Sequence, residues 1–349
     1  MIKTDILIIG AGPTGLFTVF EAGLLKLKCH LIDALPQPGG QCSEIYPKKP
    51  IYDIPGFPEV LAGDLTHNLL EQGKQFEPGF TLGERADTIE KLADGSFIVT
   101  TNKGTKHHAP IVAIAGGLGS FEPRKPLIEN IANYEDNGVA YFIKDPEVYR
   151  NKKVVISGGG DSALDWSVFL ADVASEVTLI HRRNEFRGAL DSVEKARELK
   201  QLDKINIITP AEVTALHGNS KLEGISILKD GEKSLLETDY FIPLFGLSPK
   251  LGPIGNWGLE IEKNAIKVDT LDYQTNIPGV FAIGDVNTYP GKLKLILCGF
   301  HEATLMCQSA YKIINPGKKY ILKYTTVSGI NGFDGTRKEA PKAVVQAIN

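Results

Sequence analysis

The sequence predicts an α/β protein built from two Rossmann-like dinucleotide-binding domains, each a three-layer ββα sandwich, with the second domain inserted into the first. Three short stretches predict this fold: GAGPTG at residues 10–15, GGGDSA at residues 158–163 and IGDV at residues 283–286. Each follows an apolar run typical of a buried parallel strand. The first two also precede a stretch with helical spacing, so each forms a strand–turn–helix unit.

Length and composition agree with two soluble domains. The chain has 349 residues, of which 42% are hydrophobic and 23% charged, as in ordinary globular proteins. A net charge of −4 argues against a nucleic-acid partner, and no apolar stretch approaches a membrane span. The four cysteines form no C-x-x-C pair and lack metal-ligand spacing, so we expect no metal and a reduced, cytoplasmic protein.

The first glycine turn is predicted to bind the ADP half of a dinucleotide. Gly10, Gly12 and Gly15 form G-x-G-x-x-G between the strand DILIIG and a helix, where free N–H groups meet a pyrophosphate. Asp33 lies 23 residues after Gly10, at the end of the next strand. An acid at this offset accepts both ribose hydroxyls, which suits FAD or NAD.

The second turn repeats this pattern with one change. Gly158, Gly160 and Ala163 form G-x-G-x-x-A, and the residue 23 positions after Gly158 is His181 rather than an acid. Two arginines follow directly, Arg182 and Arg183. Guanidinium groups suit a 2′-phosphate, so the second site is predicted to bind NADPH. Its predicted residues are Gly158, Gly160, Asp161, Ser162, His181, Arg182, Arg183 and Arg187.

The third stretch, IGDV, is similar to the second fingerprint of two-dinucleotide flavoproteins. Further pieces lie between the turns and beyond them: PGGQ, YDIPGFPE, HRRNEFR and GPIGNWGL. In this order they resemble, over nearly the whole chain, the ferredoxin/flavodoxin–NADP⁺ reductases of the thioredoxin-reductase-like type. The resemblance implies FAD in the first site, NADPH in the second, and electron transfer between NADPH and ferredoxin or flavodoxin. A hydride would pass to flavin N5, followed by two one-electron transfers, which requires no catalytic side chain.

One departure from thioredoxin reductases supports this choice. Those enzymes carry a C-x-x-C dithiol just before the second glycine turn, whereas this chain has Tyr141-Phe142-Ile143-Lys144 there. Disulfide exchange needs an attacking and a resolving thiolate, so electrons are expected to leave the flavin directly. Two alternatives stay open: a disulfide reductase with a relocated thiol, for which Cys42 is the candidate, and a non-catalytic FAD/NADPH redox sensor.

The resemblance also assigns residues to the FAD site. The C-terminal extension is expected to come from the partner subunit of a homodimer, with an aromatic over the flavin, and the helix opening near Gly299 would aim its N-terminus at the flavin. The FAD-site residues are Gly10, Gly12, Thr14, Gly15, Asp33, Gln41, Tyr46, Ala86, Phe121, Asp285, Tyr324 and Thr326.

Lysines near the C-terminus are predicted to attract the electron carrier. Between Val286 and Thr326 the only acid is Glu302, and this excess of positive charge would steer an acidic ferredoxin or flavodoxin, although a solvated lysine face is an equally good interpretation. The six lysines are Lys292, Lys294, Lys312, Lys318, Lys319 and Lys323.

Gly- and Pro-rich links near residues 118 and 247 are predicted to separate the domains. The first part of the FAD domain would span residues 1–117, and the NADPH domain would span residues 118–246. The second part of the FAD domain, with the C-terminal extension, would span residues 247–349.

Overall fold

The computed structural model describes residues 1–119, 122–135, 137–248 and 250–318, which form two compact units. Residues 116–266 of the second unit are inserted between two parts of the first unit, as expected for this fold class. The second unit also contains residues 37–66, while the first contains residues 1–36, 67–115 and the chain from 267 onward. The assignment of residues 118–246 to NADPH binding stays a prediction.

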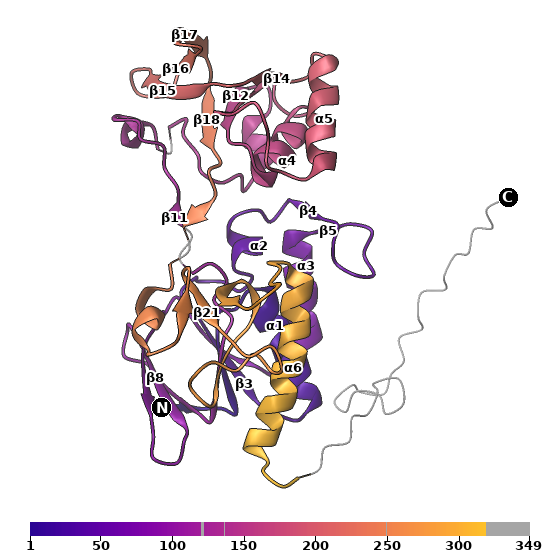
Figure 1. Cartoon of the computed structure of the whole chain (residues 1–349), viewed down its shortest axis with the longest axis vertical. Helices are drawn as coiled ribbons and strands as arrows, with labels where there is room; N and C mark the ends of the chain where they lie inside the picture. Colours follow the sequence, from indigo (N-terminus) through magenta and orange to yellow (C-terminus); the bar gives the residue numbers. More distant parts are fainter. Residues whose placement is uncertain (120–121, 136, 249, 319–349) are drawn as a thin grey trace, which may run out of the picture. The chain divides into compact units, whose positions relative to one another are not determined.

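The first unit is organised around a five-stranded parallel sheet (Figure 1). The central strands are buried along their whole length and consist largely of isoleucine, leucine and valine, as expected for a strand covered on both faces. In spatial order the strands are β22 (Val280–Ala282), β10 (Ile111–Ile114), β2 (Ile6–Ile9), β3 (Cys29–Asp33) and β6 (Gly79–Leu82).

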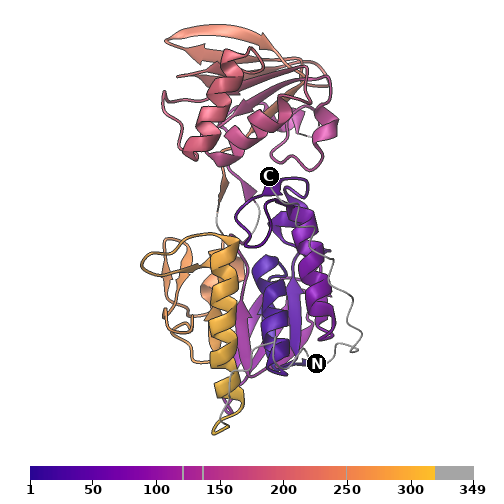
Figure 2. The ribbon, with the colours of Figure 1, turned by 90° about the vertical axis from the view of Figure 1, so that its right-hand side faces the viewer.

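Helices cover one side of this sheet and a second sheet lies on the other (Figures 1 and 2). Phe17 and Phe300 join two of the helices, with ring centroids 4.7 Å apart. The helices are α1 (Pro13–Leu24), α3 (Ala62–Lys74) and α6 (Ile296–Ile314). The second sheet has the order β1 (Ile2–Lys3), β9 (Lys106–Ala109), β8 (Phe97–Thr101) and β7 (Ala86–Lys91).

The second unit repeats this three-layer plan. Strand β12 shows why: Val154 and Ile156 belong to the core on the helix side, and Val155 belongs to the core on the opposite side, because successive side chains alternate. The parallel sheet has the order β14 (Asn206–Ile208), β13 (Glu176–Ile180), β12 (Lys153–Ser157) and β18 (Tyr240–Pro243). The helices are α4 (Asp161–Leu170) and α5 (Leu190–Gln201). The antiparallel layer is β15 (Glu212–His217), β16 (Gly224–Lys229) and β17 (Glu232–Glu237).

Short elements complete the described chain. Strands β11 (Glu122–Pro123) and β19 (Leu247–Ser248) pair antiparallel, so the two predicted links run side by side. The remaining α-helix and strands are α2 (Gln41–Glu44), β4 (Pro50–Ile51), β5 (Val60–Leu61), β20 (Ile261–Glu262), β21 (Ala265–Lys267) and β23 (Asn287–Thr288). The 3₁₀ helices are η1 (Ile131–Tyr134), η2 (Pro146–Tyr149), η3 (Gly252–Asn256) and η4 (Gly284–Val286). Among the described helices, none combines the length and apolar character needed to cross a membrane.

Candidate functional site

The first glycine turn joins β2 to α1 and needs glycine at its crowded positions. A Cβ on Gly15 would lie 2.0 Å from the Gly10 carbonyl oxygen, whereas a Cβ on Gly12 would have no described neighbour within 4 Å. Gly12 is the N-cap of α1, and no side chain caps this helix end. The close contact at Gly15 brings the helix onto the turn, and the open side at Gly12 leaves room for a phosphate beside the helix N-terminus.

Asp33 closes the far side of this turn. Its Oδ2 accepts a hydrogen bond from Ala11 N at 2.7 Å, and its Oδ1 accepts one from Leu35 N at 2.9 Å. Burial raises the pKa of this carboxyl, while the two backbone hydrogen bonds act to lower the pKa. Each oxygen keeps a lone pair, so Asp33 can still receive hydroxyl groups of a ribose.

Two distant parts of the chain converge on Thr14. A Cβ on Gly284 would lie 3.1 Å from Thr14 Oγ1, and a Cβ on Gly299 would lie 2.2 Å from the same atom. Gly284 begins η4, which carries Asp285. Helix α6 begins at Ile296, so Gly299 lies in its first turn, slightly inside the predicted start. The fold therefore joins the first glycine turn, the IGDV turn and the α6 N-terminus.

Asp285 sits in this junction as a half-buried carboxyl. Burial raises its pKa, and the positive charges of Lys292 and Lys294 act in the opposite direction. Within the described ranges it accepts no hydrogen bond, so its oxygens are available to a ligand. Behind Asp285, the buried Asn287 Oδ1 also has no partner among the described residues.

The second glycine turn has the same construction in the second unit. A Cβ on Gly158 would lie 2.7 Å from the Leu244 carbonyl oxygen and 2.8 Å from Ala163 Cβ, whereas Gly160 faces open space. Asp161 is the first residue of α4, and its Oδ1 accepts a hydrogen bond from Ala189 N at 2.7 Å. Asp161 therefore anchors the basic loop to the turn, and Ser162 beside it is exposed.

The basic loop folds back against this turn. Arg187 N donates to the Gly159 carbonyl at 2.7 Å, and a Cβ on Gly159 would lie 2.2 Å from the His181 ring. His181 stacks on Phe186 with ring centroids 5.4 Å apart, and its buried Nε2 has no described partner. Burial lowers the pKa of His181, and the neighbouring arginines lower it further. A neutral imidazole therefore backs the turn.

Three arginines of the loop are close enough for their charges to act on His181. Arg182, Arg183 and Arg187 are all exposed, and none forms an ion pair with any residue that the structure describes. Positive side chains without partners, next to an open glycine turn, are the arrangement that a phosphate requires. The 23-residue offset from Gly158 thus leads to a loop that does contact the glycine turn.

Other predicted site residues lie elsewhere. Gln41 opens α2 and is half-buried, and Tyr46 packs against the helix-side core of the second unit, with Lys49 Nζ 5.9 Å from its ring centroid. Ala86 is 2% exposed at the start of β7. The roles of these three residues toward FAD stay predictions. Phe121, Tyr324 and Thr326 lie outside the described residues.

The predicted lysine surface is divided. Lys292 does not belong to the predicted exposed surface. Its side chain is only 6% exposed, and its Nζ lies 2.5 Å from the fully buried Glu302. Lys294, Lys312 and Lys318 are exposed, but Lys312 follows the start of α6 by 16 residues, or about 24 Å. Lys319 and Lys323 lie outside the described residues. Sequence reasoning missed the Lys292–Glu302 pair, because no local pattern marks it.

The segment that replaces the dithiol is used for packing. Tyr141 lies against one core of the second unit and donates a hydrogen bond to Glu135 at 2.8 Å. Ile143 is 1% exposed in the other core, and Lys144 pairs with Glu44. Cys42, the candidate for a relocated thiol, is 2% exposed. Residues 141–144 therefore carry no thiol, and the Cys42 side chain is shielded from solvent.

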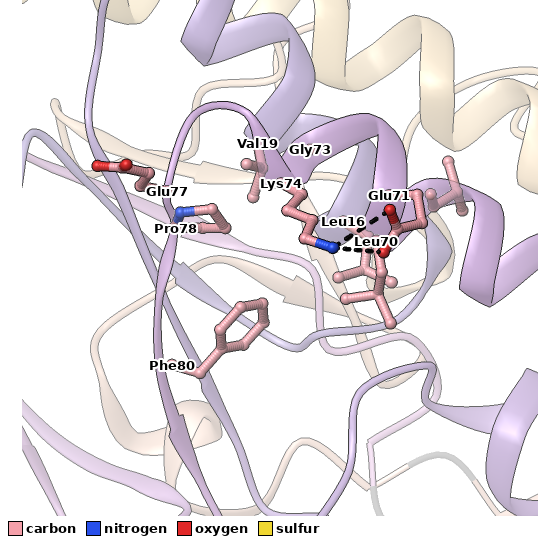
Figure 3. Close-up of a pocket in the computed structure, with 10 residues that line it drawn as sticks. Leu16, Val19, Leu70, Glu71, Gly73, Lys74, Glu77, Pro78 and Phe80 are labelled. Carbon is pink, nitrogen blue, oxygen red and sulfur yellow. Dashed lines mark hydrogen bonds and ion pairs between the residues drawn. The ribbon is translucent and has the colours of Figure 1, made fainter.

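A pocket also lies between α1, α3 and β6 (Figure 3). Its volume is about 300 Å³, and its wall is mainly apolar, with Leu16, Leu70 and Phe80 beside the Lys74–Glu71 ion pair. None of the predicted site residues lines it, so it is separate from both glycine turns.

The two glycine turns, each at the carboxyl end of a parallel sheet, define a protein with two dinucleotide-binding units. Residues 4–303 match the model of a family described as pyridine nucleotide-disulphide oxidoreductase. A ferredoxin–NADP reductase of Flavobacterium johnsoniae is 80% identical over the full length of both chains. One of Parvibaculum lavamentivorans is 51% identical, covering 94% of this chain and 96% of that protein.

Solved structures show the same fold. A thioredoxin reductase of Lactococcus lactis has a TM-score of 0.77 at 25% identity, covering 89% of this chain and 99% of that chain. A second one, from T. acidophilum, has a TM-score of 0.78 at 24% identity. The chain belongs to the pyridine nucleotide-disulphide oxidoreductase family and, within it, to the ferredoxin–NADP reductases of the thioredoxin-reductase-like type.

Proposed function

We infer that the protein is a ferredoxin–NADP reductase, a flavoprotein that transfers electrons between NADPH and ferredoxin through FAD. The observation that carries this inference is the 80% identity, over the full length of both chains, to a protein of that name. The packed Tyr141–Lys144 segment disfavours the alternative of a disulfide reductase. The redox-sensor alternative predicts negligible turnover with any carrier.

The residues around the first glycine turn fit FAD. We propose that Gly10, Gly12 and Gly15 bind its pyrophosphate, that Asp33 binds the adenosine ribose and that Asp285 binds the ribityl chain. The uncapped N-terminus of α6 offers a positive dipole end beside Thr14. A bound FAD would supply the exchange between two-electron hydride transfer and single-electron transfer, and the residues named above would hold it.

The residues around the second turn fit NADPH. The uncapped start of α4 and the open Gly160 would receive the pyrophosphate. Arg182 and Arg183 would hold the 2′-phosphate, and Arg187 stands close to the same turn through its backbone bond to Gly159. His181 contributes as a neutral ring behind the turn.

The partner and the assembly are also proposals. Flavodoxin could replace ferredoxin, since both are small acidic carriers, and Lys294 beside the flavin site would attract either. We propose a homodimer in which Tyr324 and Thr326 of the extension complete the partner's flavin site. Four cysteines without a disulfide suit the reducing cytoplasm.

Anaerobic mixing tests this function. The FAD-loaded protein should be bleached rapidly by NADPH and slowly by NADH, and ferredoxin or flavodoxin should then restore the oxidised flavin spectrum. Cys42→Ser should keep full NADPH-driven reduction of cytochrome c through ferredoxin. Loss of that activity in Cys42→Ser would favour the thiol mechanism, and the absence of turnover with every carrier would favour a redox sensor.

A further inference from the structure

Helix α6 buries one carboxylate, Glu302, which is fully inaccessible. Four hydrogen-bond donors converge on it, all from one short segment, residues 284–292. Its Oε2 accepts from Gly284 N at 2.7 Å and from Asn287 Nδ2 at 2.8 Å. Its Oε1 accepts from Tyr289 OH at 2.9 Å and from Lys292 Nζ at 2.5 Å.

A carboxylate can accept hydrogen bonds from all four of these groups. Two carboxylate oxygens offer about four lone pairs, and each of the four donors receives one. A glutamine at this position could not serve all four groups: its amide N–H₂ would face either the Gly284 and Asn287 N–H groups or the Lys292 ammonium, depending on how the amide were turned. Through these hydrogen bonds, Glu302 anchors residues 284–292 to the first turns of α6.

The anchored segment, residues 284–292, contains Asp285. The residue before it, Gly284, donates its backbone N–H to Glu302. Asn287 extends the connection, since its Nδ2 also donates to the Ala282 carbonyl at 2.9 Å, at the end of β22. Strand, turn and helix are thus joined at one buried atom, Glu302 Oε2. A shift of this atom would move the Asp285 backbone.

We propose that Glu302 is a positioning residue for the flavin site, which fixes Asp285 through the Gly284 and Asn287 hydrogen bonds and balances the buried charge of Lys292. The inference rests on the proposed function, because it takes Asp285 to be a flavin ligand. Glu302 does not itself need to touch the flavin; it acts through residues 284–292.

The charge balance gives the inference a second consequence. Lys292 is close enough to Asp285 for its charge to lower the pKa of that carboxyl. Without Glu302, the Lys292 ammonium would lose its nearest negative charge, and more of its positive charge would act on a flavin bound at Asp285, which would favour the anionic reduced form. Loss of Glu302 should therefore make the flavin easier to reduce, whereas a purely structural defect would not move the potential in a fixed direction.

Glu302→Gln tests both consequences. FAD affinity, measured by fluorescence after removal and titration of the cofactor, should weaken by about tenfold or more, as expected for a lost charged hydrogen-bond set. The flavin midpoint potential should become more positive. Glu302→Gln/Lys292→Met should return the potential toward the wild-type value without restoring the affinity. Glu21→Gln is the matched control, because Glu21 is half-buried and faces α6 through Thr304. It should leave the FAD affinity within about twofold of the wild-type value and the midpoint potential unchanged.

If Glu302→Gln does not fold, Tyr289→Phe and Lys292→Met test the same contacts, because each removes one donor to Glu302. Each should weaken FAD binding more than Glu21→Gln does, and Lys292→Met should lower the midpoint potential. Unchanged affinity and potential in the folded variants would overturn the inference. Wild-type protein is titrated in parallel: if it does not bind FAD, the proposed function fails, whereas normal wild-type binding with an unaffected Glu302→Gln rejects only the role of Glu302.

Discussion

Gly299 lies directly against Thr14: a Cβ on Gly299 would be 2.2 Å from Thr14 Oγ1 and 3.3 Å from Thr14 Cβ. Thr14 belongs to the first glycine turn and Gly299 to the first turn of α6. The missing side chain at Gly299 is what allows the α6 N-terminus to reach the phosphate-binding turn.

We therefore expect Gly299→Ala to lower the free energy of unfolding by about 1–3 kcal/mol through overpacking and to weaken FAD binding. Thr14→Ala/Gly299→Ala should recover most of the stability, because the clashing Oγ1 is removed. Chemical denaturation and FAD titration measure the two effects. The control is Gly255→Ala, where the nearest neighbour of the added Cβ is 3.9 Å away; equal stability of the two single variants would contradict the expectation.

The basic loop should determine coenzyme preference. Losing Arg182 or Arg183 removes a charged hydrogen bond to the 2′-phosphate, worth roughly 1.5–3 kcal/mol. In Arg182→Ala and Arg183→Ala, kcat/KM for NADPH should fall by about one to two decades, while the value for NADH should barely change. Arg150→Ala, which breaks only a surface pair with Glu147, should affect neither coenzyme. Equal losses with NADPH and NADH would refute the assignment.

Two buried histidines should make the first unit sensitive to acid. Thr81 Oγ1 lies 2.8 Å from His30 Nε2 and 2.9 Å from His107 Nε2, so it donates to one ring and accepts from the other. Burial lowers the pKa of His30 to about 4 and also lowers the pKa of His107. Both rings are therefore neutral in the folded protein at neutral pH.

The pKa of His30 is lower in the folded protein than in the unfolded chain. The contribution of its neutral ring to the free energy of unfolding is therefore present above about pH 6.5 and is lost as pH falls through about 4. In this window the free energy of unfolding should fall by about 1.4 kcal/mol per pH unit for each proton taken up. His30→Asn should show a shallower slope between pH 6.5 and 4 than the wild type, and the exposed His67→Asn should not. Identical slopes in all three proteins would show that the buried ring does not contribute.

The divided lysine surface predicts unequal effects on the carrier. Lys294 precedes α6 and its charge reaches Asp285, whereas Lys312 lies near the other end of the helix. Lys294→Glu should raise KM for ferredoxin several-fold at low ionic strength, and added salt should reduce the difference. Lys312→Glu, the same charge change at a distance, should have a smaller effect. Equal effects would point to general attraction by net charge rather than to a docking surface near the flavin.

The sequence by itself determined the class of fold and the positions of both dinucleotide turns. These features are local: the spacing of Gly10, Gly12 and Gly15 fixes a turn between a strand and a helix, and the 23-residue offset spans one helix and one strand. The replacement of an acid by His181 and Arg182 could be seen for the same reason, since each unit fixes its own geometry.

Only the tertiary structure decided what meets across long sequence separations. The charge of Lys292 looked available for a partner, but the fold buries it against Glu302; His30 and His107 carry no motif, yet Thr81 joins them. Residue type alone does not determine whether a lysine or a histidine is solvated. That depends on which distant donors and acceptors replace water around it, because a buried charge or polar group is stable only when such partners are in place.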